Sequence, residues 1–218
     1  MEVIIQYLES SIKSLSLSLI LGGAFGNLFE EVTAENLLEV TFSDQLVGCQ
    51  EPYINPTGYA IHSAIYQARP EVNAIFHLHT PASIAVSAQE QGLLPVSQHA
   101  YHFYERIGYF EYDSLTLHQS TQGADIAKKL IKDHPILILR NHGTLVCGKT
   151  LQEAFFYQYH LERACQVQCL LNGQNNFVMP PKKTCQKAYQ DILSVEENLG
   201  ERDWAAFVRK LERLKKEA

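Results

Sequence analysis

The segment VNAIFHLHTP, residues 72–81, decides the fold class because it reads as a β-strand that runs directly into a helix. Its apolar run predicts a strand that ends near His79. Thr80 can cap the following helix, and Pro81 suits the first helical position, where a missing N–H costs nothing. Side chains on a strand alternate between its two faces, so His77 and His79 project the same way. The segment therefore predicts an α/β unit with two imidazoles at the carboxyl end of its strand, the edge where such sheets bind ligands.

The same alternation of helix and strand continues around this segment. Apolar residues at helical spacing predict a helix that starts at Pro56 and stops before Pro70. A further helix is expected over about 123–133. It is followed by an apolar strand over 135–139 that suits burial on both faces. Residues 144–148 are expected to form its hairpin partner. The predicted fold class is therefore α/β with a central mixed sheet.

Later in the chain, Thr150 and Glu153 form a capping box that opens a helix of about 20 residues, ending at 172–173. Before residue 56, strands are expected over 14–19 and 38–42.

The C-terminal part is expected to be a linker followed by one helix. Two successive prolines indicate a linker over 174–184, and Asp203 is expected to cap the last helix. That helix is amphipathic, with an apolar stripe of Trp204, Phe207, Leu211 and Leu214. The chain is accordingly divided into a domain over 1–173 and a linker with a helical tail over 174–218.

Composition excludes several classes of function. The chain has 218 residues and a net charge of −6, which argues against a general nucleic-acid or anionic-membrane binder. No apolar run approaches the roughly 18 residues of a membrane span. The first residues lack the basic stretch of a secretory signal. Five cysteines without a CxxC pair indicate free thiols. We therefore expect a cytoplasmic protein with no nucleic-acid or membrane partner.

A third histidine turns the pair at 77 and 79 into a candidate metal site. His142 follows the apolar strand and precedes Gly143, which gives the backbone freedom to turn. Three imidazoles from two strand ends match an open tetrahedral zinc site, whose fourth position is left for water or substrate. Manganese, iron or cobalt could use the same ligands. A purely structural trio of histidines is the alternative.

The other six histidines are expected in surface or packing positions: His62, His99, His102, His118, His134 and His160. The last three of these have no obvious companions. His62 and His99 are the two that could approach the metal.

A series of motifs resembles the class II aldolase/adducin family, and is closer to its adducin-like bacterial branch than to the sugar-phosphate aldolases. The motifs are NPTGYAIHSAIY at 55–66, ARP at 68–70, FHLHTP at 76–81, GLLPVS at 92–97, ILRNHG at 138–143 and WAAFVRKL at 204–211. The resemblance implies a three-layer α/β/α fold that assembles as a homotetramer, with active sites at subunit interfaces. It also implies that His77, His79 and His142 hold zinc. In the aldolases this metal polarises a ketone carbonyl and stabilises the enediolate left by carbon–carbon cleavage.

The sequence departs from the aldolases at three places. Gly58 stands where they have a glutamate that serves as general acid and base, a function that typically contributes about 10²–10⁴ in rate. Pro56 and Thr57 replace a hydroxyl pair that helps to hold substrate phosphate. The N-terminal glycine-asparagine phosphate segment is not visible, and the chain is expected to be shortened at its start.

The sequence is compatible with two functions. The first is a metal-dependent lyase acting on a small carbonyl or hydroxy compound. Its base would be a metal-bound hydroxide, His62, or the 99–104 segment of a neighbouring subunit, and Glu51, Glu105 and Glu111 are candidate replacement carboxylates. The second is a catalytically silent binding or scaffold domain, as in adducin. An unrelated α/β domain with incidental histidines is a third reading.

Overall fold

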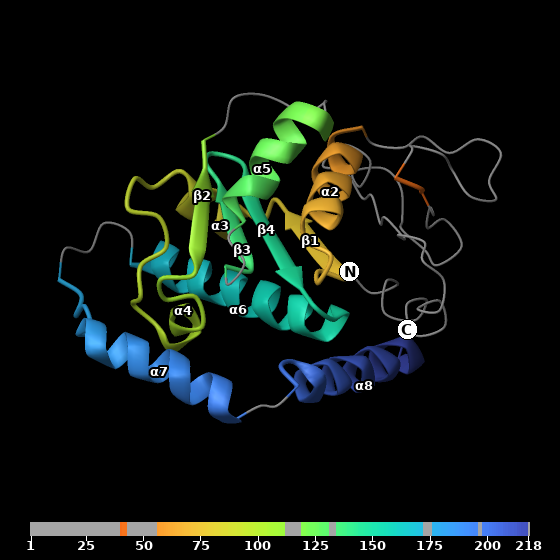
Figure 1. Cartoon of the computed structure of the whole chain (residues 1–218). Coiled ribbons are helices and arrows are strands. Elements are labelled where there is room, and N and C mark those ends of the chain that lie inside the picture. Colours follow the sequence, from red (N-terminus) through yellow and green to blue (C-terminus); the bar gives the residue numbers. More distant parts are fainter. Residues whose placement is uncertain are drawn as a thin grey trace. The chain divides into compact units, whose positions relative to one another are not determined.

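The computed structural model describes residues 40–42, 56–111, 119–130, 134–171, 176–195 and 198–217 (Figure 1). The chain divides into two compact units. One comprises 1–68, 114–127 and 208–218, and the other comprises 69–113 and 128–207. The sheet and the three predicted metal ligands belong to the second unit.

The second unit is built on a mixed sheet. In the described residues its strand order is β1 (Ala74–Leu78), β4 (Gly143–Gly148), β3 (Ile136–Leu139) and β2 (Ile107–Phe110) (Figure 1). β4 pairs antiparallel with β1 and with β3, whereas β2 runs parallel to β3. Every residue of β3 and β4 is buried, which explains their near-continuous apolar sequences. The mixed sheet is confirmed, and β2 is a strand that sequence analysis missed.

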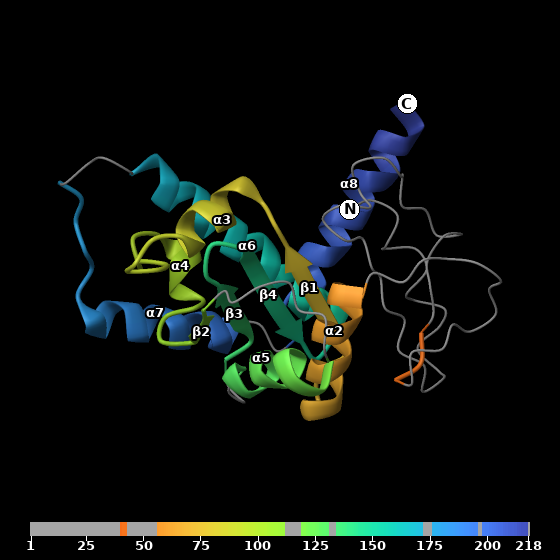
Figure 2. The same ribbon diagram turned by 90° about the horizontal axis from the view of Figure 1, so that it is seen from above.

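Two helices pack together on this sheet. α6 (Leu151–Leu170) contacts β1, β4 and α3 (Pro81–Ser87), and Figure 2 shows α3 and α6 on the same side of the strands. A cluster of buried residues joins them: Val86, Phe103, Ile136, Val146, Phe156, Tyr157, Leu161 and Cys165. Burial of these apolar side chains is the main stabilising contribution in this unit.

The capping residues of α6 act as predicted, with one difference. The Thr150 hydroxyl accepts a hydrogen bond from the Glu153 N–H at 3.1 Å. The Glu153 carboxylate reaches back to the N–H of Lys149 at 2.6 Å, one residue earlier than in the standard capping box. The helix is 20 residues long and ends at Leu170, close to the predicted end.

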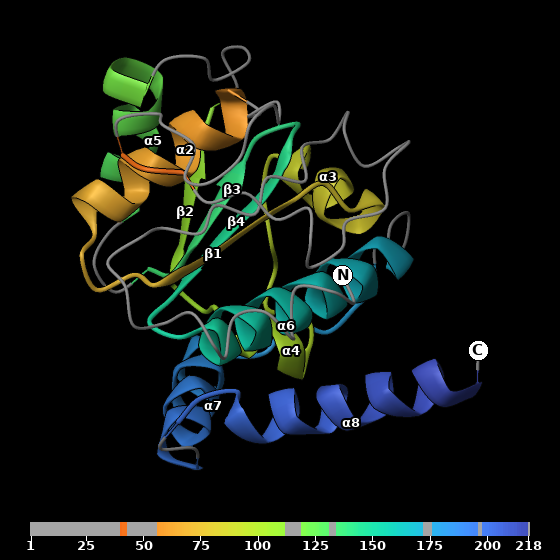
Figure 3. The same ribbon diagram turned by 90° about the vertical axis from the view of Figure 1, so that its right-hand side faces the viewer.

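Three histidines connect the short helix α4 (Gln98–Tyr101) to α6, beside which it lies (Figure 3). His99 Nδ1 lies 3.0 Å from His160 Nδ1, and the ring centroids of His102 and His160 are 4.4 Å apart. Two ring nitrogens in contact require one N–H and one lone pair, so at least one of His99 and His160 is a neutral imidazole. The expectation that His160 has no companion was wrong, because its partners lie far away in the sequence.

Burial controls the ionisation of this histidine cluster. It lowers the pKa of His102 to about 3, with further lowering by His160 and His99. Burial also lowers the pKa of His160 to about 4; His99 adds to this and Asp203 opposes it. The pKa of His99 is lowered by burial and then by Arg163. All three imidazoles are therefore neutral near pH 7.

The C-terminal part contains one helix more than predicted. α7 (Lys182–Val195) begins directly after Pro181, inside the range expected to be a linker. α8 (Glu201–Glu217) begins two residues before Asp203, which lies in its first turn and is not the cap. The predicted apolar stripe starts to pack as expected, since the rings of Trp204 and Phe207 lie 5.3 and 5.1 Å from that of Phe155. No helix in the described ranges combines the length and apolar character that a bilayer crossing requires.

The first unit contains α2 (Pro56–Ala68), whose bounds match the prediction, and the short π-helix η2 (Gln119–Gly123). The two helices approach closely, because a Cβ on Gly123 would lie 2.3 Å from the carbonyl oxygen of Ala60. The helix expected over 123–133 is the shorter α5 (Ala124–Lys129). The strand expected over 14–19 and the first part of 38–42 lie outside the described residues.

The core assignment of α6 can be tested with two leucines on the same helix. Leu161 is 0% exposed and Leu170 is 79% exposed. Leu161→Ala should lower the free energy of unfolding by about 2–5 kcal/mol, because it removes buried methyl groups and leaves a cavity. Leu170→Ala should change it by less than about 0.5 kcal/mol. Urea unfolding in the presence of a chelator would measure both, and equal effects would contradict the assignment.

The histidine cluster should make the protein less stable in mild acid. The folded-state pKa of His102, about 3, lies below the value of 6.5 that is usual for an exposed histidine. The unfolded chain therefore binds more protons, and stability falls as the pH drops from about 6.5 towards 3. His102→Gln should reduce the loss of unfolding free energy between pH 7 and pH 5 by roughly 1 kcal/mol, a figure discounted for solvent screening. An unchanged pH slope in urea titrations would refute this role.

Candidate metal centre

His77 is held in a defined orientation by the neighbouring strand. It lies on β1, where its Cα partner is Leu145 of β4. Its Nδ1 lies 3.0 Å from the carbonyl oxygen of Thr144. A carbonyl can only accept, so Nδ1 carries the hydrogen, and in the neutral ring the lone pair lies on Nε2. This is the arrangement that fixes the tautomer of a metal-binding histidine.

His79 faces the Nε2 atom of His77. It directly follows β1, and its Nε2 lies 3.1 Å from the Nε2 of His77. Two nitrogens bound to one tetrahedral zinc, with bonds of about 2.0–2.1 Å, lie roughly 3.3 Å apart. The spacing of the two imidazoles therefore fits a shared ion.

His142 joins them from the turn between β3 and β4. Asn141 has a left-handed φ of 54°, and the N–H of His142 donates to the Leu139 carbonyl at 3.1 Å. Gly143 is required by close packing, because a Cβ there would lie 2.4 Å from the carbonyl oxygen of Leu78. The ring centroid of His142 lies 5.1 Å from that of His77 and 4.7 Å from that of His79.

The three imidazoles form a half-buried ligand set in which the pKa values of His79 and His142 are lowered. One nitrogen from each ring lies within 4.8 Å of the others. Burial lowers the pKa of His142 to about 4, with a further contribution from His79, and burial also lowers the pKa of His79. Neutral imidazole is the form that binds a metal, so the lone pairs are available near pH 7. Sequence analysis placed these residues together, and the structure brings them together.

A carboxylate supports the start of the helix that follows His79. Thr80 caps α3, and its hydroxyl donates to the carboxylate of Glu162 on α6. The other oxygen of Glu162 accepts from Gln166 at 2.8 Å. Sequence analysis missed Glu162, because 82 positions separate it from Thr80 and no local motif signals the contact.

The carboxylates considered as replacements for the aldolase glutamate have other partners. Glu111 is 88% exposed and lies 3.8 Å from the Arg140 Nε, while Glu105 accepts from the Gln186 side chain at 3.4 Å. Glu51 lies outside the described residues. His62 is buried in α2, where burial lowers its pKa to about 4. Gly58 is a buried residue of α2.

Among solved structures, the chain is similar to an aldolase II superfamily protein of Pseudomonas syringae. That similarity has 37% identity and a TM-score of 0.74, covering 91% of this chain and 83% of the other. An L-fuculose 1-phosphate aldolase of Glaciozyma antarctica is 27% identical, with a TM-score of 0.70, covering 83% of this chain and 69% of the other. The expected α/β/α fold around a mixed sheet is thereby confirmed.

Sequence comparison points the same way. α-Adducin of Rattus norvegicus is 35% identical over 205 residues, which span 87% of this chain and 28% of that protein. The family description "Class II Aldolase and Adducin N-terminal domain" matches residues 11–169. The chain is therefore a member of the class II aldolase and adducin family.

Proposed function

We propose that the chain binds a divalent metal through His77, His79 and His142, with zinc as the expected ion, and acts as a lyase on a small carbonyl or hydroxy compound. The observation that carries the proposal is the approach of His77 Nε2 and His79 Nε2 to 3.1 Å, with His77 fixed through Nδ1 by the Thr144 carbonyl. Packing alone would not require one ring nitrogen from each of the three histidines to converge within 4.8 Å. Class II aldolases typically depend on a divalent metal, and the ligand set here fits one.

Different residues have different roles in such a site. A metal bound there supplies Lewis-acid polarisation of a substrate carbonyl. Thr144 keeps His77 in one tautomer, and the left-handed Asn141 directs the chain so that His142 closes the ligand set. Thr80 and Glu162 fix the start of α3 directly after His79. These contacts hold the three ligands before any substrate arrives, which reduces the reorganisation needed during reaction.

Proton transfer must differ from that of the sugar-phosphate aldolases. Gly58 offers no acid or base at the position that the resemblance assigns to their glutamate. His99, one of the candidates for this role, has its Nδ1 in contact with His160. The loss of a placed carboxylate typically costs about 10²–10⁴ in rate, so we expect slow turnover unless another group supplies the proton.

A binding or scaffold role is the second candidate, and Gly58 is the observation that favours it. The similarity to α-adducin covers 87% of this chain. In this case the metal centre would stabilise the fold without turning over a substrate.

We also propose that the protein is a cytoplasmic homotetramer. The family resemblance supports the tetramer. The free cysteines of the described residues, Cys147, Cys165, Cys169 and Cys185, suit a reducing compartment.

Metal loading tests the ligand set directly. Protein stripped with a chelator should take up one Zn²⁺ per chain and gain about 2.7 kcal/mol in unfolding free energy at a hundredfold excess over the dissociation constant. His142→Ala should abolish both effects. His134→Gln is the matched control, since His134 precedes the strand that His142 follows. Equal uptake by wild type and His142→Ala, measured by elemental analysis, would exclude this ligand set.

Turnover distinguishes the lyase from the scaffold. We expect the metal-loaded protein to cleave or rearrange at least one member of a panel of small aldol, decarboxylation and dehydration substrates, faster than the His142→Ala variant. Stopped assays by chromatography would detect the products. The scaffold role would be favoured if the wild type turns over no substrate faster than the variant does. Capture on the intact chain should in that case recover a specific protein partner.

A further inference from the structure

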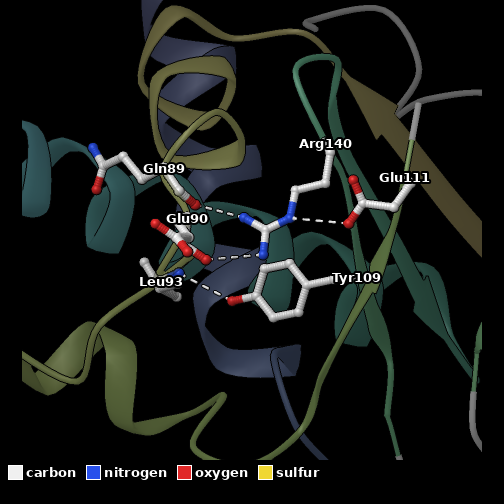
Figure 4. A network of polar contacts seen from close by, with 6 residues as sticks. All are labelled: Gln89, Glu90, Leu93, Tyr109, Glu111 and Arg140. Atoms are coloured by element: carbon white, nitrogen blue, oxygen red, sulfur yellow. Dashed lines mark hydrogen bonds and ion pairs between the residues drawn. The ribbon is translucent and has the colours of Figure 1, made fainter. Parts of the chain in front are cut away.

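Arg140 lies in the turn that carries His142, and its side chain reaches away from that turn to the segment after α3. Figure 4 shows the guanidinium between the backbone at Gln89 and Glu90 on one side and the ring of Tyr109 on the other. Nη1 donates to the Gln89 carbonyl at 2.5 Å and Nη2 donates to the Glu90 carbonyl at 3.1 Å. The Cζ atom lies 4.4 Å from the centre of the Tyr109 ring. We call this set of contacts the Arg140 bridge.

The backbone of Arg140 is fixed as well. Its N–H donates to the Phe110 carbonyl at 2.9 Å, which prolongs the pairing of β2 with β3 by one residue. Two residues later the N–H of His142 closes the turn on Leu139. Arg140 is therefore held at both its backbone and its guanidinium, at the base of the turn from which His142 projects.

The segment that receives the guanidinium is itself anchored. Nε2 of Gln168, from α6, donates to the Gly92 carbonyl at 2.8 Å and to the Gln89 side chain at 2.6 Å. The Tyr109 hydroxyl accepts from the N–H of Leu93 at 3.0 Å. His79 lies just before the N-terminal end of α3, and this segment follows its C-terminal end. The bridge therefore connects the C-terminal end of α3 to the turn that carries His142.

The guanidinium is well suited to this task and the nearby ion pair is not. A planar guanidinium can donate to two carbonyls at once and stack on an aromatic ring, whereas an ammonium is a point charge. Glu111 lies 3.8 Å from Nε but is 88% exposed, and ion pairs of that kind contribute little. The geometric constraint therefore comes from the two carbonyls and Tyr109.

We infer that Arg140 is a positioning residue for the metal centre: through the Arg140 bridge it fixes the His142 turn relative to α3 and hence relative to His79. This rests on the proposed metal-binding function for its consequence, but its structural part does not depend on a metal. Groups that orient metal ligands typically contribute about 10–100-fold to metal affinity.

Two measurements on Arg140→Met, Arg140→Lys and Glu111→Gln test the inference. The first is hydrogen exchange by NMR in metal-free protein. The His142 amide should exchange at least several times faster in Arg140→Met, while the Cys147 amide, bonded to Pro135 at the other end of β4, should keep its rate. The second is Zn²⁺ affinity by chelator competition. Arg140→Met should bind roughly tenfold more weakly, and Glu111→Gln should match wild type.

Arg140→Lys keeps a charge over Tyr109. It is therefore the second variant to measure in case Arg140→Met does not fold. It should show a smaller change in the same direction. Unchanged His142 exchange in both Arg140 variants would overturn the inference, and so would faster exchange with unchanged zinc affinity. If wild type binds no zinc, the proposed function fails, and the exchange result alone decides whether Arg140 positions the turn.

Discussion

The antiparallel pairing of β1 with β4 is the constraint on which the candidate site depends. The register sets Leu78 opposite Thr144, so the Thr144 carbonyl can accept from the His77 ring. A slip of one residue would turn every side chain of β1 to the opposite face and remove both histidines from the site. The same pairing brings Gly143 against the Leu78 backbone, which places the His142 turn beside the end of β1. Strand register, fixed by burial of β4, thus determines where the imidazole nitrogens lie.

Much of this site could be predicted because its signals are local. The spacing of His77 and His79 on a strand, the Thr80 cap and the glycine after His142 each depend on neighbours in the sequence. The start of α2 at Pro56 follows from the preference of proline for the first helical position, and the start of α6 follows from the Thr150 cap, both of which are local signals. These features were correct because local preference and tertiary packing agree there.

The features that were missed depend on contacts between distant residues. β2 is a strand of four residues that is identified by its pairing with β3, and its sequence lacks a distinctive period. His160 looks isolated on α6 until α4 brings His99 to it. Glu162 likewise gains its role from Thr80. α7 was not predicted, because prolines precede it and because only one of its described residues, Cys185, is buried. Periodicity cannot reveal side-chain partners that are set by the tertiary fold.

Ligand geometry and proton transfer depend on different residues in the proposed site. The His77 imidazole is oriented by the Thr144 carbonyl, so the ligand set does not need a side chain at position 58, where the resemblance to the aldolases places their proton-transferring glutamate. A family that contains both aldolases and adducins can accommodate both outcomes on one scaffold, since function depends on the site and not on the fold.

The Arg140 bridge has a consequence for how this sequence can diverge. Its two acceptors are main-chain carbonyls, which every residue type supplies, so replacing the side chain of Glu90 leaves them in place. Adding or deleting a residue between α3 and Gly92 would instead move the carbonyls out of register with the guanidinium. The bridge therefore restricts the length of this loop far more than its composition. Relatives that share the histidine triad should accordingly be compared by the length of this loop and not by its residue identities.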